Sequence, residues 1–304
     1  MAFKRSGVRL PLAPPTFAAT MLLTLAAAGL IRAAELPDLP AGREVSPGVT
    51  LHEVTLDRSG VPMRLWVYLP TKTPVMRKLP TALIAPAGSR LYHGIRLGVG
   101  DQPEHVPYPR SGFAVIAYDI DGPRPDQPTE AQLRAAIVAF RNARAGLDNA
   151  KAAIDYALAK VPQVDPRRIY AVGHSSAGTL ALQVAQQDDR VAACVAFAPV
   201  VSVGDQITAS FAAVLDQELP GTVALLRQLS PDANVARLKV PTLLFYAQDD
   251  NATLTTKLAA FTDALARTNP NVKVITVPSG GHYAAMVEQG IPAAIAWLAA
   301  MRPK

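Results

Sequence analysis

The sequence predicts an α/β fold, in which a doubly wound, mostly parallel sheet begins with an antiparallel N-terminal hairpin and carries helices on both faces. The first observation behind this prediction is a series of short, nearly all-apolar runs, which are typical of parallel strands covered on both faces. These runs span residues 82–85, 113–118, 169–172, 191–197, 242–246 and 272–277. The second observation is that helical stretches lie between several of the runs, which indicates right-handed crossovers between parallel strands.

A hairpin is predicted before these runs. Residues 35–48 are rich in Pro and Gly and are expected to form an extended lead-in. Residues 51–56 and 63–68 then alternate apolar and polar side chains around the turn Asp57-Arg58-Ser59-Gly60. Alternation on both sides of a Gly-containing turn is typical of two antiparallel strands.

The longest helical pattern covers residues 129–160. It opens with Thr129 and Gln132, which have the spacing of a capping box, and Gly146 marks the point at which a break is expected. Further helices are predicted over residues 176–187, 253–267 and 292–300.

The composition agrees with one full-sized domain. The chain has 304 residues, of which 50% are hydrophobic and 18% charged, so a disordered chain is excluded and a large core is available. Residues 35–304 are predicted to form this single domain, with a small helical insertion near residues 201–239, a segment longer than an ordinary crossover. The lone cysteine, Cys194, excludes an internal disulfide and a cysteine-rich zinc site, and its apolar surroundings predict a buried thiol.

The N-terminal segment, residues 1–34, is predicted to be a signal peptide. It begins with three basic residues within nine positions and continues with an apolar run over residues 17–31. This run is shorter than the roughly 20 residues of a membrane-spanning helix, and small residues follow it, as in secretory signals. Cleavage after Ala28 or Ala34 fits the pattern, and an uncleaved leader that tethers the protein to a membrane is the alternative. The mature chain is expected to be exported, periplasmic or secreted, without a membrane span.

The net charge does not indicate nucleic-acid binding. The chain has 30 Lys and Arg against 24 Asp and Glu, a net charge of +6. Four of the basic residues and none of the acidic ones lie in residues 1–34, so the rest of the chain carries 26 − 24 = +2. A nearly balanced domain lacks the basic footprint that phosphate backbones require, and no nucleic-acid partner is expected.

The most informative motif is Gly173-His174-Ser175-Ser176-Ala177. An apolar strand enters this segment and a helix leaves it, which is the strand–turn–helix context of a nucleophile elbow. Ser175 is therefore the predicted nucleophile, and the residues on either side must be small because strand and helix pass close together. Ser176 is the alternative nucleophile, but its frame would put the bulky ring of His174 at a small position. The plain alternative is a serine that only caps a turn.

A serine nucleophile needs a base, and the base needs a carboxylate to orient it. In a fold of this kind the chain order is Ser, acid, His, and His282 is the only histidine after the motif. It lies in a Gly-rich loop directly after the run 272–277. Asp249 and Asp250 both follow the run 242–246 and both fit the acid, and Asp205 is a further alternative.

Two donors are expected for the oxyanion that forms during attack on a carbonyl group. The first is the backbone N–H of Ser176 at the amino end of the helix. The second is the N–H of Gly88 or Ser89, in the loop after the run 82–85, where Pro86 has no N–H to donate. The alternative for this loop is an ordinary Gly-Ser turn. Pocket-lining positions are also considered at Tyr92, His93 and residues 118–123, against plain turn chemistry.

These stretches resemble the α/β-hydrolase superfamily, in particular its dienelactone-hydrolase-like and prolyl-oligopeptidase-like serine hydrolase branch. The resemblance covers about residues 50–300 and is most specific at residues 164–175, 238–244 and 280–282. It implies that Ser175, Asp250 and His282 form a catalytic triad, because the family pattern places the acid third after a small residue, here Ala247.

The sequence departs from the family pattern at two places. The His-Gly-Gly loop common in the superfamily is replaced by Pro86-Ala87-Gly88, which affects the assignment of the oxyanion donors. Ser176 stands where peptidase members often carry an aromatic residue, and this weakens a peptidase interpretation.

The function expected from these features is a serine hydrolase that cleaves carboxylic esters through an acyl-enzyme intermediate. A prolyl-oligopeptidase-like peptidase or amidase, and a non-catalytic binding protein with the same fold, are the alternatives. The expected partner is a small-molecule or peptide-like ester substrate. No histidine spacing typical of metal sites and no Gly-rich phosphate loop occurs in the sequence, so neither a metal nor a cofactor is expected.

Overall fold

The computed structural model of the protein describes residues 36–303, apart from the side chains of residues 205 and 253. The predicted signal peptide lies outside the described residues. The chain from Leu36 onward forms one compact unit. None of the helices in this part of the chain has the combined length and hydropathy of a membrane-spanning segment.

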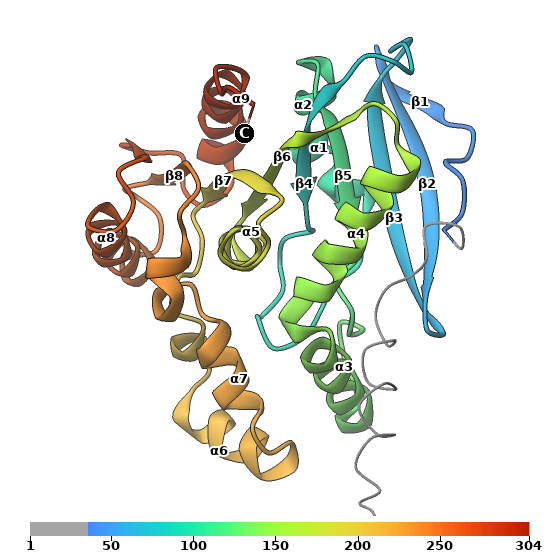
Figure 1. The fold of residues 1–304 in the computed structure, drawn as a ribbon. Coiled ribbons are helices and arrows are strands. Elements are labelled where there is room, and N and C mark those ends of the chain that lie inside the picture. The colour runs from blue at the N-terminus through green and yellow to red at the C-terminus, as the bar shows by residue number, and fades with distance from the viewer. Residues whose placement is uncertain (1–35, 304) are drawn as a thin grey trace, which may run out of the picture. The chain divides into compact units, whose positions relative to one another are not determined.

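A nine-stranded sheet with the order β1-β2-β3-β5-β4-β6-β7-β8-β9 runs through the described residues (Figure 1). Pairing is antiparallel from β1 to β5 and parallel between all later neighbours. The strands are β1 (Arg43–Ser46), β2 (Val49–Arg58), β3 (Val61–Pro70), β4 (Leu79–Ile84), β5 (Ala114–Tyr118), β6 (Val164–His174), β7 (Val191–Phe197), β8 (Thr242–Ala247) and β9 (Val272–Val277). The predicted fold class is confirmed.

Two hydrophobic cores cover the two faces of the sheet. One core includes α4 (Leu147–Lys160), α5 (Ser176–Gln187) and α8 (Ala252–Ala266), and the other includes α2 (Pro107–Arg110) and α9 (Ile291–Ala299). Successive residues of a strand point to opposite faces, so Tyr170 of β6 enters the core with α9 while Ala171 enters the core with α4. A strand buried on both faces must be apolar throughout, which is why the apolar runs predicted the strands.

The predicted hairpin is β2–β3, whose two-residue turn consists of Ser59 and Gly60. Both have positive φ, 57° and 85°, the conformation that matches the twist of an antiparallel pair. The lead-in predicted before the hairpin contains β1, which pairs with β2 at the sheet edge. Its four residues are exposed or half-buried, so the sequence carries no apolar pattern that would have revealed it.

The predicted long helix consists of two pieces, α3 (Glu130–Asn142) and α4, with a 3₁₀ turn, η3 (Arg144–Gly146), between them. Thr129 and Gln132 form the predicted capping box at the start of α3. The break falls at Gly146, where φ is +92° and a Cβ atom would lie 3.0 Å from the side chain of Leu180 on α5. A close approach of the chain to α5 therefore accompanies the break.

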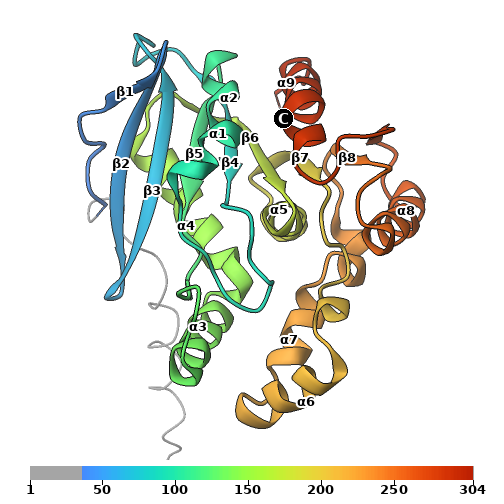
Figure 2. The same cartoon turned by 180° about the vertical axis from the view of Figure 1, so that it is seen from behind.

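The predicted insertion after β7 contains two α-helices flanked by 3₁₀ turns. They are η4 (Val203–Gln206), α6 (Ala209–Glu218), α7 (Thr222–Leu229) and η5 (Asp232–Arg237). Figure 2 shows α6 and α7 at the end of the unit where α3 also lies, and Leu215, Leu219 and Val223 pack with Ile137 of α3. The loop between β4 and β5 holds η2 (Val99–Asp101), α1 (Gln102–His105) and α2, which were not predicted because prolines interrupt the helical pattern.

Candidate active site

Ser175 lies in a sharp turn between β6 and α5. Its backbone angles are φ 54° and ψ −121°, a conformation that is strained for a residue with a side chain. The turn is held by the Ser175 N–H, which donates to the carbonyl of Phe197 at 2.8 Å, and by the Ser175 carbonyl, which accepts from the Thr179 N–H at 3.0 Å. This is the strand–turn–helix arrangement that the sequence predicted for a nucleophile.

Close packing inside the turn requires small residues. A Cβ atom on Gly173 would lie 2.2 Å from the carbonyl oxygen of Ala177, which confirms the predicted close approach of strand and helix. Gly178 has a second constraint that the sequence analysis missed, since a Cβ atom there would lie 3.2 Å from the carbonyl oxygen of Phe197 on β7. A turn built this way exposes the Ser175 side chain at the carboxyl end of β6.

His282 is bound to Asp250. The Nδ1 atom of His282 lies 2.7 Å from Oδ2 of Asp250, and because a carboxylate only accepts, Nδ1–H is the donor. The Asp250 side chain is 6% exposed and that of His282 is 40% exposed. The other carboxylate oxygen accepts from the N–H of Asn251 at 2.6 Å. The buried acid therefore fixes the imidazole orientation and leaves Nε2 for another partner.

Asp249, the neighbouring acid, contacts the backbone of the histidine loop. Its carboxylate accepts from the N–H groups of Gly280 at 3.1 Å and Gly281 at 2.9 Å. Both glycines have positive φ, 119° and 61°, so this carboxylate holds a loop conformation that favours glycine. The side chain of Asp205, the third alternative for the acid, lies outside the described residues.

A second histidine also contacts the histidine loop. His174, at the end of β6, has Nε2 2.8 Å from the carbonyl oxygen of His282, so Nε2–H donates to that carbonyl. Its other ring nitrogen lies 3.7 Å from Oε1 of Glu104. Glu104 could not be predicted from the sequence, because a lone acid in a Pro-rich loop carries no motif that would place it here.

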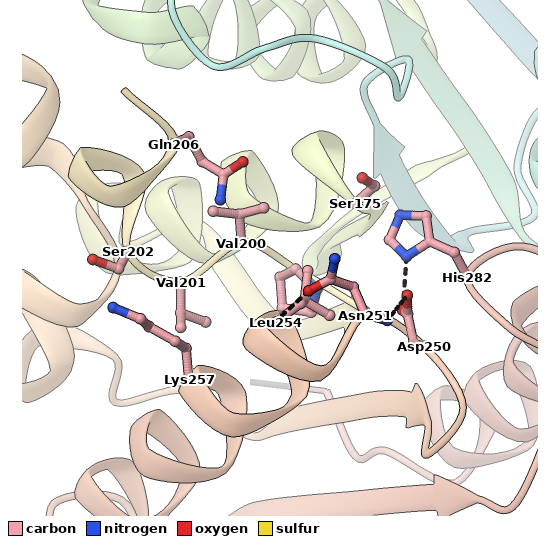
Figure 3. Close-up of a pocket in the computed structure, with 11 residues that line it drawn as sticks. Ser175, Val200, Val201, Ser202, Gln206, Asp250, Asn251, Leu254, Lys257 and His282 are labelled. Carbon is pink, nitrogen blue, oxygen red and sulfur yellow. Dashed lines mark hydrogen bonds and ion pairs between the residues drawn. The ribbon is translucent and has the colours of Figure 1, made fainter. Parts of the chain in front are cut away.

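Ser175, Asp250 and His282 all border one cavity of about 330 Å³. Figure 3 shows the imidazole of His282 turned toward Ser175, with Asp250 on the other side of the ring. The remaining wall comes from the segment after β7 and from the start of α8: Pro199, Val200, Val201, Ser202, Gln206, Asn251, Leu254 and Lys257. Among the described residues no hydrogen bond joins the Ser175 hydroxyl to the imidazole, and such bonds are often long until substrate binds.

The predicted oxyanion loop lies directly against the nucleophile turn. The N–H groups of Gly88 and Ser89 both donate to the hydroxyl oxygen of Ser176, each at 3.0 Å. The Ser176 N–H itself is the first of α5 and has no acceptor within the helix. The three residues predicted as oxyanion donors are thus brought together, with the two loop amides bound to the Ser176 side chain.

The other positions considered for the pocket have structural roles. Asp119 pairs with Arg64 at 2.9 Å and accepts from the Leu97 N–H at 2.7 Å. His93 is buried and accepts from Nε of Arg124 at 3.1 Å, and burial lowers its pKa. Both side chains are therefore held by neighbouring residues of the domain, as turn chemistry predicts.

A family model described as "Prolyl oligopeptidase family" matches residues 108–300, which include Ser175, Asp250 and His282. A search of curated protein sequences finds no significant match. Among solved structures, an acetyl xylan esterase from Paenibacillus sp. R4 is similar, with a TM-score of 0.63 and 18% identity over 89% of this chain and 91% of that chain.

Two further solved structures have a comparable likeness. An S-formylglutathione hydrolase from Agrobacterium tumefaciens has a TM-score of 0.63 and 16% identity over 86% of this chain and 99% of that chain. An acylaminoacyl peptidase from Pyrococcus horikoshii has a TM-score of 0.62 and 14% identity over 83% of this chain and 40% of that chain. At these identities the likeness concerns the fold.

Proposed function

The chain belongs to the prolyl oligopeptidase family within the α/β-hydrolase superfamily, and on this basis we propose that it is a serine hydrolase that cleaves carboxylic esters. Ser175 is the nucleophile, His282 the base and Asp250 the acid that orients the base. The observation that carries this proposal is the hydrogen bond between Asp250 and His282 on the wall of the cavity that Ser175 also borders. A binding protein has no need for this arrangement.

The mechanism is a two-step acyl transfer. Nε2 of His282 takes the proton of the Ser175 hydroxyl as the oxygen attacks the ester carbonyl. The tetrahedral intermediate collapses when the alcohol leaves with that proton, and water then attacks the acyl-enzyme with the same nitrogen as base. Asp250 keeps the proton on Nδ1 and stabilises the imidazolium form.

Two observations support an ester rather than an amide substrate. The acetyl xylan esterase and the S-formylglutathione hydrolase are aligned over 91% and 99% of their own lengths, whereas the acylaminoacyl peptidase is aligned over 40% of its length. Ser176 also stands where peptidases of the prolyl-oligopeptidase-like branch often carry an aromatic residue. The family description favours a peptidase or amidase as the second candidate.

Labelling with a fluorophosphonate probe tests the enzyme class. The native protein is expected to be labelled, and Ser175→Ala is expected to lose the label while keeping the native circular dichroism spectrum. If the native protein is not labelled, both hydrolase proposals fail and a non-catalytic binding protein is favoured.

Paired chromogenic substrates then separate ester from amide hydrolysis. For the same acyl group, kcat/KM is expected to be at least a hundredfold higher for the p-nitrophenyl ester than for the p-nitroanilide of an N-acyl amino acid, after correction for the uncatalysed rates. A corrected preference for the anilide would favour the peptidase candidate.

A further inference from the structure

The hydroxyl of Ser176 lies between the nucleophile turn and the loop after β4. It accepts one hydrogen bond from the Gly88 N–H and one from the Ser89 N–H, each at 3.0 Å. The Ser176 residue is 4% exposed and directly follows the nucleophile. This side chain therefore joins two segments that are separated by 88 and 87 positions in the sequence.

The two lone pairs of the Ser176 hydroxyl have partners, whereas its O–H does not among the described residues. A serine hydroxyl has two lone pairs and one O–H donor, and both lone pairs are taken by the loop amides. Within residues 36–303, no acceptor binds the O–H. Ser176 does not itself line the cavity, but it directly follows Ser175, which does, so this O–H is available to a group held at the Ser175 side chain.

The Ser176 backbone points to the same conclusion. Its N–H begins α5, and the first amides of a helix have no acceptor within the helix. One residue next to the nucleophile thus offers two donors, the backbone N–H and the hydroxyl. A hydroxyl that accepts two hydrogen bonds is polarised and becomes a stronger donor.

We propose that Ser176 supplies both oxyanion donors, its backbone N–H and its side-chain O–H, and that the Gly88 and Ser89 amides act through the hydroxyl. This inference rests on the proposed function. The carbonyl oxygen of the substrate becomes negative as Ser175 attacks, accepts both hydrogen bonds and returns to a carbonyl when the leaving group departs. Ser176 keeps its proton throughout, so the step balances without transfer to or from this residue.

This arrangement differs from the donors expected from the sequence. There, the amide of Gly88 or Ser89 was expected to contact the oxyanion directly, whereas here both amides bind the Ser176 oxygen. Hydrogen bonds to a charged oxygen are about twice as strong as neutral ones. Removal of one donor from an oxyanion hole lowers kcat by about 10²- to 10³-fold in other serine hydrolases.

The test compares Ser176→Ala with Ser176→Thr, which keeps a hydroxyl. For a p-nitrophenyl ester, Ser176→Ala is expected to lower kcat at least thirtyfold with KM within threefold of the native value, and Ser176→Thr to recover at least a third of the native kcat. Thr242→Val is a matched control. It removes another buried hydroxyl, at the start of β8 and away from the end of the strand that leads to Asp250.

Inhibitor binding distinguishes oxyanion stabilisation from a structural role. An aliphatic trifluoromethyl ketone adds to the serine and forms an oxyanion, whereas the carboxylic acid product does not. The inhibition constant of the ketone is expected to rise in Ser176→Ala by the same factor as kcat/KM falls, while that of the acid stays within twofold.

Two results would overturn the inference. A Ser176→Ala variant with native kcat would show that the loop amides bind the oxyanion directly once the hydroxyl is absent. Equal losses of ketone and acid affinity would show a structural role. Failure of the proposed function is recognised separately, because the native protein would then resist the fluorophosphonate probe.

Discussion

Asp249 and Asp250 are neighbours in the sequence but bind different partners. Asp250 accepts from the His282 ring, and Asp249 accepts from two backbone amides of the loop that carries His282. The first contact orients the His282 ring, and the second holds the backbone of the loop. The two acids are therefore expected to contribute to activity for different physical reasons.

Substitution of each acid by its amide separates these roles. Asp250→Asn is expected to lower kcat by about 10³- to 10⁴-fold with little change in KM, because an amide stabilises neither the required tautomer nor the imidazolium. Asp249→Asn keeps an acceptor for one glycine amide, and a loss of less than about tenfold in kcat is expected. Steady-state kinetics of the two variants measure the contrast. Equal losses would contradict the division of roles.

At the scale of elements, the cavity is built by segments that follow the carboxyl ends of parallel strands. The turn after β6 provides Ser175, the segment after β7 provides Val200 and Val201, and α8 after β8 provides Leu254. In a parallel sheet these ends meet at one edge. Apolar side chains from the last two segments line the cavity that Ser175 also borders, and the acyl group of the substrate is expected to contact them.

A larger side chain at Leu254 is expected to shorten the preferred acyl chain. In Leu254→Phe, the ratio of kcat/KM for the p-nitrophenyl hexanoate to that for the acetate should fall at least tenfold, because one methylene in an apolar pocket is worth about 10- to 200-fold. Ala259→Phe introduces the same side chain at an exposed position of α8 and should leave the ratio unchanged. An unchanged ratio in both variants would place the acyl group elsewhere.

At the scale of the whole molecule, the stability of the domain should depend on His105. This histidine ends α1, is 1% exposed and contacts the ring of Tyr68 at a centroid distance of 5.5 Å. Burial lowers the pKa of His105 to about 3, so the folded protein holds the ring neutral. Below the ordinary histidine pKa the unfolded chain binds a proton that the folded chain does not, and stability falls as the pH falls toward 3.

Removal of this group should flatten the pH dependence. Between pH 7 and pH 5 the native protein is expected to lose about 2 kcal/mol of unfolding free energy through His105. The loss of unfolding free energy in His105→Phe over the same pH range should be smaller by this amount. Urea unfolding at the two pH values measures the difference. His52→Gln replaces a half-buried histidine of β2 and serves as the control. Parallel pH profiles for native protein and His105→Phe would contradict the assignment.

The sequence determined the central strands and the nucleophile turn. The inner strands of the parallel region, such as β5, β7 and β8, are covered on both faces, so burial makes them apolar almost without interruption and the apolar run reveals them. The turn was also visible, since Gly173 is required by a contact only four residues away along the chain, with Ala177. Strand β1 and helices α1 and α2 were not visible, because an exposed edge strand and short Pro-interrupted helices depend on the surface they pack against.

Only the tertiary structure decided which neighbouring group meets which partner. Asp249 and Asp250 have the same chemistry, and the direction in which the chain leaves β8 determines that one meets the ring and the other the glycine amides. The contact of Gly88 and Ser89 with the Ser176 hydroxyl likewise joins residues far apart in the sequence. Local patterns report burial and backbone conformation, whereas the direction of a hydrogen bond between distant segments is set by the packing of the whole sheet.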